Sequence, residues 1–219
     1  MKTKMFLLDL DGTAGNTLLS IASTANRTLE EFGLPVQPVP NYRFYAGDGA
    51  DVMIKRAAEA SSETDPELIR KITARYRENF IDGCVYQVSS FPGLESTLTR
   101  LKKAGVRLAI CSNKDQKMAE KVIFAIYGEG LFDVVYGISA ELPAKPDPSM
   151  PLLASSMFSA SPEECVYVGD TNTDMKCGKA AGMYTVGVTW GFRSREELIA
   201  SGADLVIDRP EELLGLLEK

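Results

Sequence analysis

MFLLDLDGT, which spans residues 5–13, is the stretch of sequence that decides the fold. An apolar run of this kind, bounded by turn-forming residues, is typical of a strand buried on both faces, as in a parallel sheet. We therefore predict a strand over Met5 to Leu10, with Asp9 and Asp11 at its end. Asp-Gly at positions 11 and 12 is also a common pair in tight turns, so a purely structural role stays open at this point.

Further short apolar runs recur in the second half of the chain, each separated from the next by a stretch long enough for a helix. They are residues 106–111, 134–138, 165–168, 184–188 and 205–207. This alternation is typical of βαβ units that form a parallel sheet covered on both faces. Capping-box patterns beginning at Ser161 and Ser194 indicate helix starts. The sequence therefore predicts an α/β fold, a three-layer Rossmann-like parallel sheet.

Residues 15–84 have a different pattern. Apolar residues recur at helical spacing in three segments, which begin near Leu18, Val52 and Leu68. Prolines separate the first two segments, and Asp65-Pro66 opens the third. We predict a small all-helical domain over 15–84, inserted after the first strand of a core made of 1–14 and 85–219.

The composition excludes several kinds of chemistry. Histidine is absent from all 219 residues, which removes Ser-His-Asp and Cys-His catalysis as well as histidine-ligated metals. Four widely spaced cysteines without a CxxC pair indicate reduced core thiols rather than disulfides or a zinc site.

Charge and hydropathy bear on partners and location. The net charge of −6 and the lack of a basic run argue against a nucleic-acid or anionic-membrane surface. No run approaches the roughly 18 apolar residues that a membrane span needs. Asp9 and Asp11 interrupt the first apolar stretch too early for a signal peptide. We expect a cytoplasmic protein, a monomer or weak homodimer, without nucleic-acid or membrane partners.

Polar side chains follow several predicted strands where each strand ends. In an open parallel sheet, ligands bind beyond the carboxyl ends of the strands, so we expect these side chains to meet at one edge. They are Asp9, Asp11, Ser112, Asn113, Lys114, Lys145, Asp170 and Asp174.

This set of side chains favours phosphoryl transfer. Several carboxylates brought together repel one another unless a cation compensates, and oxygen ligands without histidine point to Mg²⁺. A lysine beside a carboxylate holds it ionised, and an ionised aspartate attacks phosphorus to give an aspartyl-phosphate. A second acid two residues along can protonate the leaving oxygen and later deprotonate water. Each feature alone is more simply a turn, a helix cap or a polar loop, so the inference depends on their joint occurrence.

The ordered set Asp9-Leu-Asp11-Gly-Thr13, Ser112-Asn113, Lys145-Pro-Asp-Pro148 and Gly169-Asp170-Thr-x-x-Asp174 resembles the four motifs of the haloacid dehalogenase superfamily. The insert resembles the helical C1-type cap of that superfamily. Within it the chain is most similar to phosphoglycolate phosphatase-like hydrolases, on residues 46–57, 91–105 and 188–213.

The resemblance implies a role for each motif residue. Asp9 would be the nucleophile and Asp11 the general acid and base. Mg²⁺ would be held by Asp9, the main-chain carbonyl of Asp11 and Asp170, with Asp174 binding through water or supporting the site. Thr13, Ser112 and Asn113 would bind the phosphate, and Lys145 would pair with both Asp9 and the phosphate.

One departure concerns the segment after the first motif. The family continues with a leucine and then Asp-Ser, whereas this chain has Ala14-Gly15-Asn16-Thr17. Asn16 and Thr17 can cap a helix, and Ala14-Gly15 would make a small, permissive hinge for the cap.

The function that the resemblance implies is a Mg²⁺-dependent phosphatase acting on phosphoglycolate or a similar small phosphate monoester. We expect the helical insert to select the substrate. Gly47 and Arg56 are candidate contacts, although a cation such as Arg56 is also explained as part of a solvated helix face.

Three alternative functions stay open: a sugar-phosphate mutase, a pyrophosphatase and, from another class, a non-catalytic binding protein of the same fold. Retention of Asp9, Asp11, Lys145 and Asp170 argues against the last, because buried charges that repel one another are costly to keep without a metal.

Overall fold

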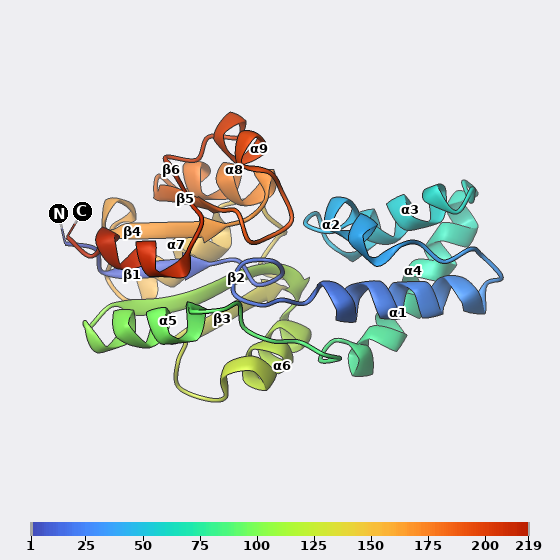
Figure 1. Cartoon of the computed structure of the whole chain (residues 1–219), viewed down its shortest axis with the longest axis horizontal. Helices are drawn as coiled ribbons and strands as arrows, with labels where there is room; N and C mark the ends of the chain where they lie inside the picture. The colour runs from blue at the N-terminus through green and yellow to red at the C-terminus, as the bar shows by residue number, and fades with distance from the viewer. Residues whose placement is uncertain (1, 219) are drawn as a thin grey trace. The chain divides into compact units, whose positions relative to one another are not determined.

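The computed structural model describes residues 2–218 and contains a six-stranded parallel sheet (Figure 1). The strand order is β3-β2-β1-β4-β5-β6, with the first strand in the middle. The strands are β1 Met5–Leu8, β2 Arg107–Asp115, β3 Val134–Ile138, β4 Cys165–Gly169, β5 Tyr184–Val188 and β6 Leu205–Ile207. This sheet confirms the predicted α/β fold.

The central strand β1 lies between β2 and β4, and all four of its residues are buried. Met5 and Leu7 belong to a core cluster that also includes Tyr167 of β4 and Met150 of the helix following β3. Complete burial of each such side chain stabilises the fold by roughly 1.5–3 kcal/mol. The expected strand over Met5 to Leu10 was too long, because Asp9 and Leu10 already lie beyond the last strand residue.

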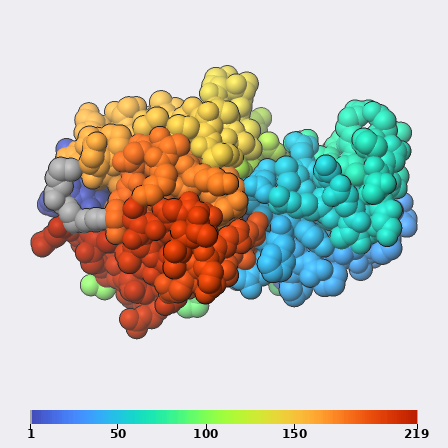
Figure 2. Space-filling model, turned by 90° about the horizontal axis from the view of Figure 1, so that it is seen from above, coloured from blue at the N-terminus to red at the C-terminus, as the bar shows by residue number. Residues whose placement is uncertain are grey.

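Helices precede, connect and follow the later strands of the core. They are α5 Leu94–Lys103, α6 Gln116–Tyr127, α7 Ser149–Met157, α8 Asn172–Ala180 and α9 Arg195–Ala200, with the 3-10 helices η2 Pro162–Glu164 and η3 Pro210–Leu216. Ser194 caps α9 as predicted, since its side chain accepts from the N–H of Glu197. Ser161 opens only the three residues of η2, because β4 begins directly after it. In Figure 2, the segment from β5 to residue 218, coloured orange to red, is exposed on the near face of the unit that contains the sheet.

Residues 17–88 form a second compact unit, distinct from the unit made of residues up to 16 together with 89 onward. Its helices are α1 Leu18–Glu31, η1 Val39–Asn41, α2 Tyr42–Tyr45, α3 Ala50–Ala60 and α4 Pro66–Gly83. Asp65 caps α4 by accepting from the N–H of Glu67 at 3.0 Å, with Pro66 at the first helical position. Within residues 2–218, no helix combines the length and apolar character needed to cross a membrane.

The segment that joins the two units makes specific hydrogen bonds, and its role as a hinge stays a prediction. Ala14 is fully buried, and its carbonyl accepts a hydrogen bond from the Tyr127 hydroxyl at 2.6 Å. Asn16 pairs with Ser89, where the chain returns to the core, through an N–H to carbonyl bond of 2.8 Å. Thr17 takes the N-cap position of α1, but its side chain makes no capping hydrogen bond, contrary to the expectation.

Candidate active site

Asp9 follows β1 at the carboxyl edge of the sheet. Its N–H donates to the carbonyl of Val168 in β4 at 2.9 Å, and only 6% of the residue is exposed. The chain then turns sharply at Gly12, whose φ is +92°. A Cβ at Gly12 would lie 2.3 Å from a carboxylate oxygen of Asp170, so the turn needs glycine for both conformation and space. The Asp-Gly turn is therefore real, and it is also what brings the first motif against Asp170.

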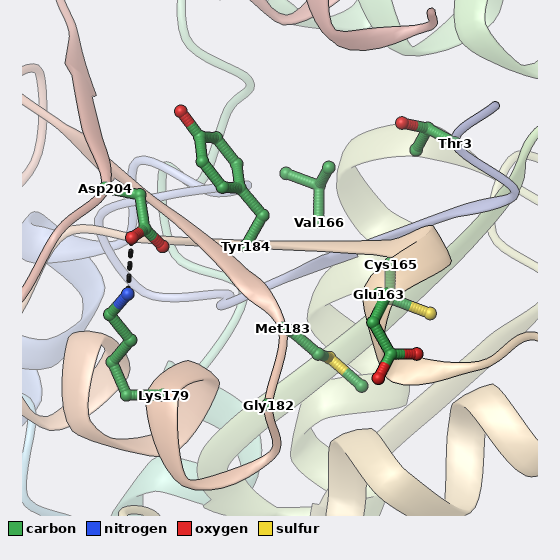
Figure 3. A pocket seen from close by; sticks show the side chains of 9 residues that line it. All are labelled: Thr3, Glu163, Cys165, Val166, Lys179, Gly182, Met183, Tyr184 and Asp204. Atoms are coloured by element: carbon green, nitrogen blue, oxygen red, sulfur yellow. Dashed lines mark hydrogen bonds and ion pairs between the residues drawn. The ribbon is translucent and has the colours of Figure 1, made fainter. Parts of the chain in front are cut away.

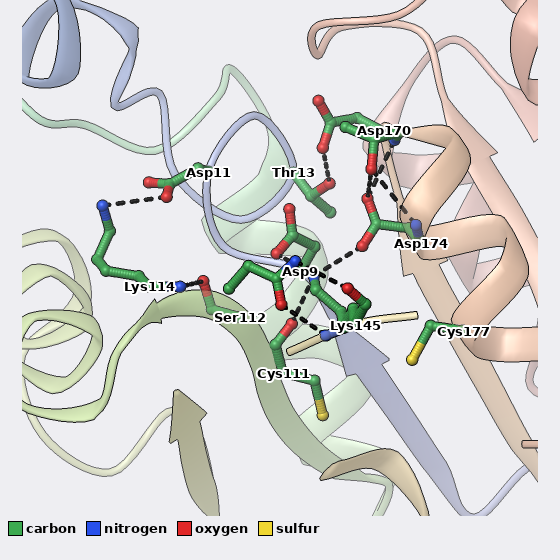
Figure 4. A network of polar contacts seen from close by, with 12 residues as sticks. Asp9, Asp11, Thr13, Cys111, Ser112, Lys114, Lys145, Asp170, Asp174 and Cys177 are labelled. Atoms are coloured by element: carbon green, nitrogen blue, oxygen red, sulfur yellow. Dashed lines mark hydrogen bonds and ion pairs between the residues drawn. The ribbon is translucent and has the colours of Figure 1, made fainter. Parts of the chain in front are cut away.

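Lys145 is the centre of a buried polar network (Figure 4). Its Nζ donates to Oδ1 of Asp9 at 2.6 Å, to Oδ1 of Asp174 at 2.7 Å and to the carbonyl of Cys111 at 2.9 Å. The side-chain amide of Asn113 fixes the lysine main chain, because it accepts from the Lys145 N–H at 2.7 Å and donates to the Lys145 carbonyl at 3.2 Å. This engagement of Asn113 was not predicted, and its contact with phosphate stays a prediction.

Asp170 is completely buried beside this network. One oxygen, Oδ1, accepts from the Thr13 hydroxyl at 2.7 Å, and the other accepts from the N–H of Phe192 at 2.7 Å. A Cβ at Gly191 would lie 2.4 Å from Oδ2, so glycine makes room for the carboxylate there as well. Thr13 thus orients a carboxylate, and its contact with phosphate, which the family resemblance implies, stays a prediction.

Asp174 serves the local structure and the network at once. Its Oδ2 accepts from the Thr171 N–H at 3.0 Å and from the Thr171 hydroxyl at 2.6 Å. The Asp174 N–H donates in turn to the Thr171 hydroxyl oxygen at 3.3 Å, which completes a capping box at the start of α8. Its Oδ1 accepts from Lys145. Both oxygens are therefore engaged within the protein.

Burial and mutual repulsion govern the ionisation of these carboxylates. Burial raises the pKa of Asp9 well above its usual value, and Asp174 raises it further, while Lys145 lowers it. Burial and Asp174 raise the pKa of Asp170 to about 7, against the hydrogen bonds from Phe192 and Thr13. Burial favours the neutral amine of Lys145, but Asp174 and Asp9 outweigh it and raise the lysine pKa. One ammonium thus faces three carboxylates, an excess of negative charge that a divalent cation would neutralise.

The donor set fits such a cation. Carboxylate oxygens of Asp9, Asp170 and Asp174 lie within 4.8 Å of one another, and all three residues are buried. Oxygen ligands of this kind suit a hard cation such as Mg²⁺. Both oxygens of Asp170 and both oxygens of Asp174 accept hydrogen bonds within the protein, and Oδ1 of Asp9 accepts from Lys145.

A second ion pair lies to one side of the Lys145 network in Figure 4. Lys114 Nζ is 3.0 Å from Oδ2 of Asp11, and the lysine side chain is 4% exposed. The main-chain N–H of Lys114 also donates to the hydroxyl oxygen of Ser112 at 3.2 Å. The sequence placed Lys114 at this strand end but gave it no role, although a basic residue directly after Ser112-Asn113 was the available signal.

Gly47 and Arg56, the two candidate substrate contacts, both lie in the helical unit. Gly47 has a φ of +116°, which glycine tolerates best. Arg56 pairs with Asp48 at 2.8 Å and donates to the carbonyl of Tyr45 at 3.0 Å. These contacts account for Arg56 within its own unit, and substrate contact by Gly47 or Arg56 stays a prediction.

A pocket of about 400 Å³ lies elsewhere in the core, beside the amino ends of β4 and β5 (Figure 3). Its lining includes Cys165, Tyr184 and the ion pair of Lys179 with Asp204. It contains none of the motif residues. The edge that carries Asp9 and Asp170 is therefore the candidate active site.

Comparison with known proteins bears on the class of chemistry. The family model described as haloacid dehalogenase-like hydrolase matches residues 6–188. A phosphoglycolate phosphatase of Haemophilus influenzae is 32% identical over 220 residues, covering 98% of each chain. One from Pseudomonas putida is 28% identical and covers 96% of this chain and 78% of its own. The crystal structure of a predicted phosphoglycolate phosphatase from Haemophilus somnus superposes with a TM-score of 0.88, at 26% identity, over 99% of this chain and 98% of that one.

Proposed function

Because the chain belongs to the haloacid dehalogenase-like hydrolases and is a phosphatase, we propose that it hydrolyses a small phosphate monoester with Mg²⁺ as cofactor. Phosphoglycolate or a similar small organic phosphate is the substrate we propose, since the relatives named above are phosphoglycolate phosphatases. The observation that carries the proposal is the buried cluster in which Lys145 contacts Asp9 and Asp174 beside Asp170.

In the proposed reaction, a carboxylate oxygen of Asp9 attacks phosphorus. A bond forms between Asp9 and phosphorus while the bond to the leaving oxygen breaks, and that oxygen takes its proton from Asp11. Asp11 then removes a proton from water, which attacks the aspartyl-phosphate and releases inorganic phosphate and the Asp9 carboxylate. The Lys145 ammonium favours the ionised form of Asp9 before the attack and after its release, because the two groups are 2.6 Å apart.

We propose that Mg²⁺ is held by Asp9, the Asp11 main-chain carbonyl and Asp170, with Asp174 supporting the site. When bound, it would neutralise charge on the phosphate oxygens. Thr13 orients Asp170 through its 2.7 Å hydrogen bond, an interaction of the kind that tunes metal affinity. Ser112 and Asn113 are the proposed phosphate contacts at the end of β2.

Substrate selection is proposed to lie in residues 15–84, acting as a cap. The core groups described above recognise phosphate, so discrimination among organic portions needs other side chains. Gly47 and Arg56 are the candidates, and release of Arg56 from its pair with Asp48 would free a cation for an acidic substrate.

The test is a screen for phosphate release from small phosphate monoesters, with and without Mg²⁺. We expect Mg²⁺-dependent release, and Asp9→Asn should lose about 10³-fold or more in turnover because no nucleophile remains. Glu129→Gln is the matched control, since it changes an exposed carboxylate to an amide in the loop after α6. Undiminished turnover by Asp9→Asn would exclude the proposed nucleophile. Stoichiometric phosphate release without a bisphosphate primer separates a hydrolase from a mutase.

A further inference from the structure

Lys114 is a buried lysine at the catalytic edge that no step of the proposed reaction uses. The residue is 7% exposed, and its ammonium lies 3.0 Å from Oδ2 of Asp11, whose side chain is 19% exposed. Burial of an ammonium is costly unless it is paired. An ammonium at the surface keeps its hydration and avoids this cost, so the buried position of Lys114 needs an explanation.

The main chain around Lys114 is held in place by β3. The pairing of β2 with β3 shifts register between Cys111 and Asp115, an irregularity of the kind that re-aims side chains. A Cβ at Gly137 of β3 would lie 2.4 Å from the Lys114 carbonyl oxygen, so the two main chains approach closely. The Gln116 amide then joins them by donating to the Val135 carbonyl at 2.8 Å and accepting from the Gly137 N–H at 2.6 Å. The contacts with β3 therefore hold in place the main chain from which the Lys114 side chain extends.

Asp11 is the more exposed partner of the pair. It precedes Gly12 in the sharp turn, and it is more exposed than Asp9, which Lys145 holds from within the core. Proton transfer needs the carboxyl within hydrogen-bond reach of the leaving oxygen. A displacement of about 1 Å at such a group can cost about 10²-fold in rate.

We propose that Lys114 is a positioning residue that holds the Asp11 carboxyl in the direction needed for proton transfer. Each aspartate of the first motif then has its own lysine, Lys145 for Asp9 and Lys114 for Asp11. The inference rests on the proposed function, in which Asp11 protonates the leaving oxygen and deprotonates water. It adds a residue that sets how fast those proton transfers occur.

The test uses substrates that differ in their need for a proton. Ethyl phosphate releases a strongly basic alkoxide that must be protonated, whereas p-nitrophenyl phosphate releases a stable phenolate. With Lys114→Met we expect kcat for ethyl phosphate to fall about tenfold or more, with KM changed by less than about twofold. The pre-steady-state burst of p-nitrophenolate should keep the rate of the unmodified enzyme, because that step needs no acid. Lys114→Arg, which keeps the cation, should recover part of kcat.

A mutant cycle decides whether Lys114 acts through Asp11. Added to Asp11→Asn, the change Lys114→Met should cost nothing further, because the carboxyl that it positions is gone. Equal losses in both backgrounds, or an equal loss of burst rate, would overturn the proposal. So would a loss confined to phosphoglycolate, which would indicate that Lys114 contacts the substrate carboxylate instead.

Two controls keep the outcomes separable. Lys103→Met removes an exposed lysine at the end of α5 and should leave both substrates unaffected. Asp9→Asn distinguishes the two proposals: if it retains turnover the proposed function fails, and if it is inactive while the mutant cycle is additive only the role of Lys114 fails. Circular dichroism of each variant shows whether it is folded.

Discussion

Replacement of Lys145 by methionine is the change whose effect on stability the structure defines best. The Lys145 ammonium makes hydrogen bonds of 2.6, 2.7 and 2.9 Å to Asp9, Asp174 and the Cys111 carbonyl. Methionine has a similar length and no charge, so it leaves the buried carboxylates without their cation. The network is deep enough that water cannot replace the lysine without entering the core.

The expected cost follows from this geometry. Removal of one partner from a buried ion pair destabilises a protein by about 3–5 kcal/mol, because the remaining charge stays buried. Uptake of a proton by one of the carboxylates relieves part of this cost, so the lower end of the range is the better expectation. For a chain of about this length, each kcal/mol shifts Tm by about 2–4 °C, so Lys145→Met should lower Tm by about 6–12 °C.

Thermal unfolding followed by circular dichroism at pH 7.5 in EDTA measures this shift without a contribution from bound metal. Lys103→Met is the control for loss of an exposed lysine. The double variant Lys145→Met with Asp174→Asn should be more stable than the single variants predict by simple addition, since it removes a charge of each sign. If the Tm of Lys145→Met lies within about 2 °C of that of the unmodified protein, the reasoning is refuted, because the buried carboxylates would then lose their cation at almost no cost in stability.

Three further changes are predicted. Thr13→Val removes the 2.7 Å hydrogen bond to Asp170 and should weaken Mg²⁺ activation about tenfold, measured by Mg²⁺ titration of phosphate release. Gly191→Ala places a methyl group 2.4 Å from an Asp170 oxygen and should abolish activity, whereas Gly215→Ala meets nothing within 4 Å and should not. Asp133→Asn should cost about 1–2 kcal/mol at pH 6. Burial tends to raise the pKa of Asp133, but hydrogen bonds from two basic side chains and a β2 N–H lower it on balance. Its stabilising effect is therefore complete above the ordinary carboxyl pKa of about 4 and lost as pH falls through the folded pKa, so the Tm gap should narrow toward pH 3.

The sequence by itself determined the kinds of elements and the chemistry available to them. The apolar run that precedes Asp9 and the alternation of later runs with helical stretches predicted a parallel sheet, because strand and helix impose different periods on buried side chains. The absence of histidine narrowed the site to carboxylates, lysines and hydroxyls. Its errors were local: the first strand ends at Leu8, β2 runs to Asp115 rather than ending at residue 111, and Ser161 opens a 3-10 turn rather than a helix.

Only the tertiary structure decided which side chains meet. Asp9 follows β1 and Lys145 lies between β3 and α7, 136 residues further along the chain. They touch because β3, β2 and β1 are neighbours with their carboxyl ends at one edge. Two contacts could not be predicted from the periodicity of the sequence. They are the hydrogen bonds of the Asn113 amide with the Lys145 main chain and the ion pair of Lys114 with Asp11. Periodicity reports which face of an element is buried, whereas partners across a sheet are set by strand order and register, which emerge only when the whole core packs.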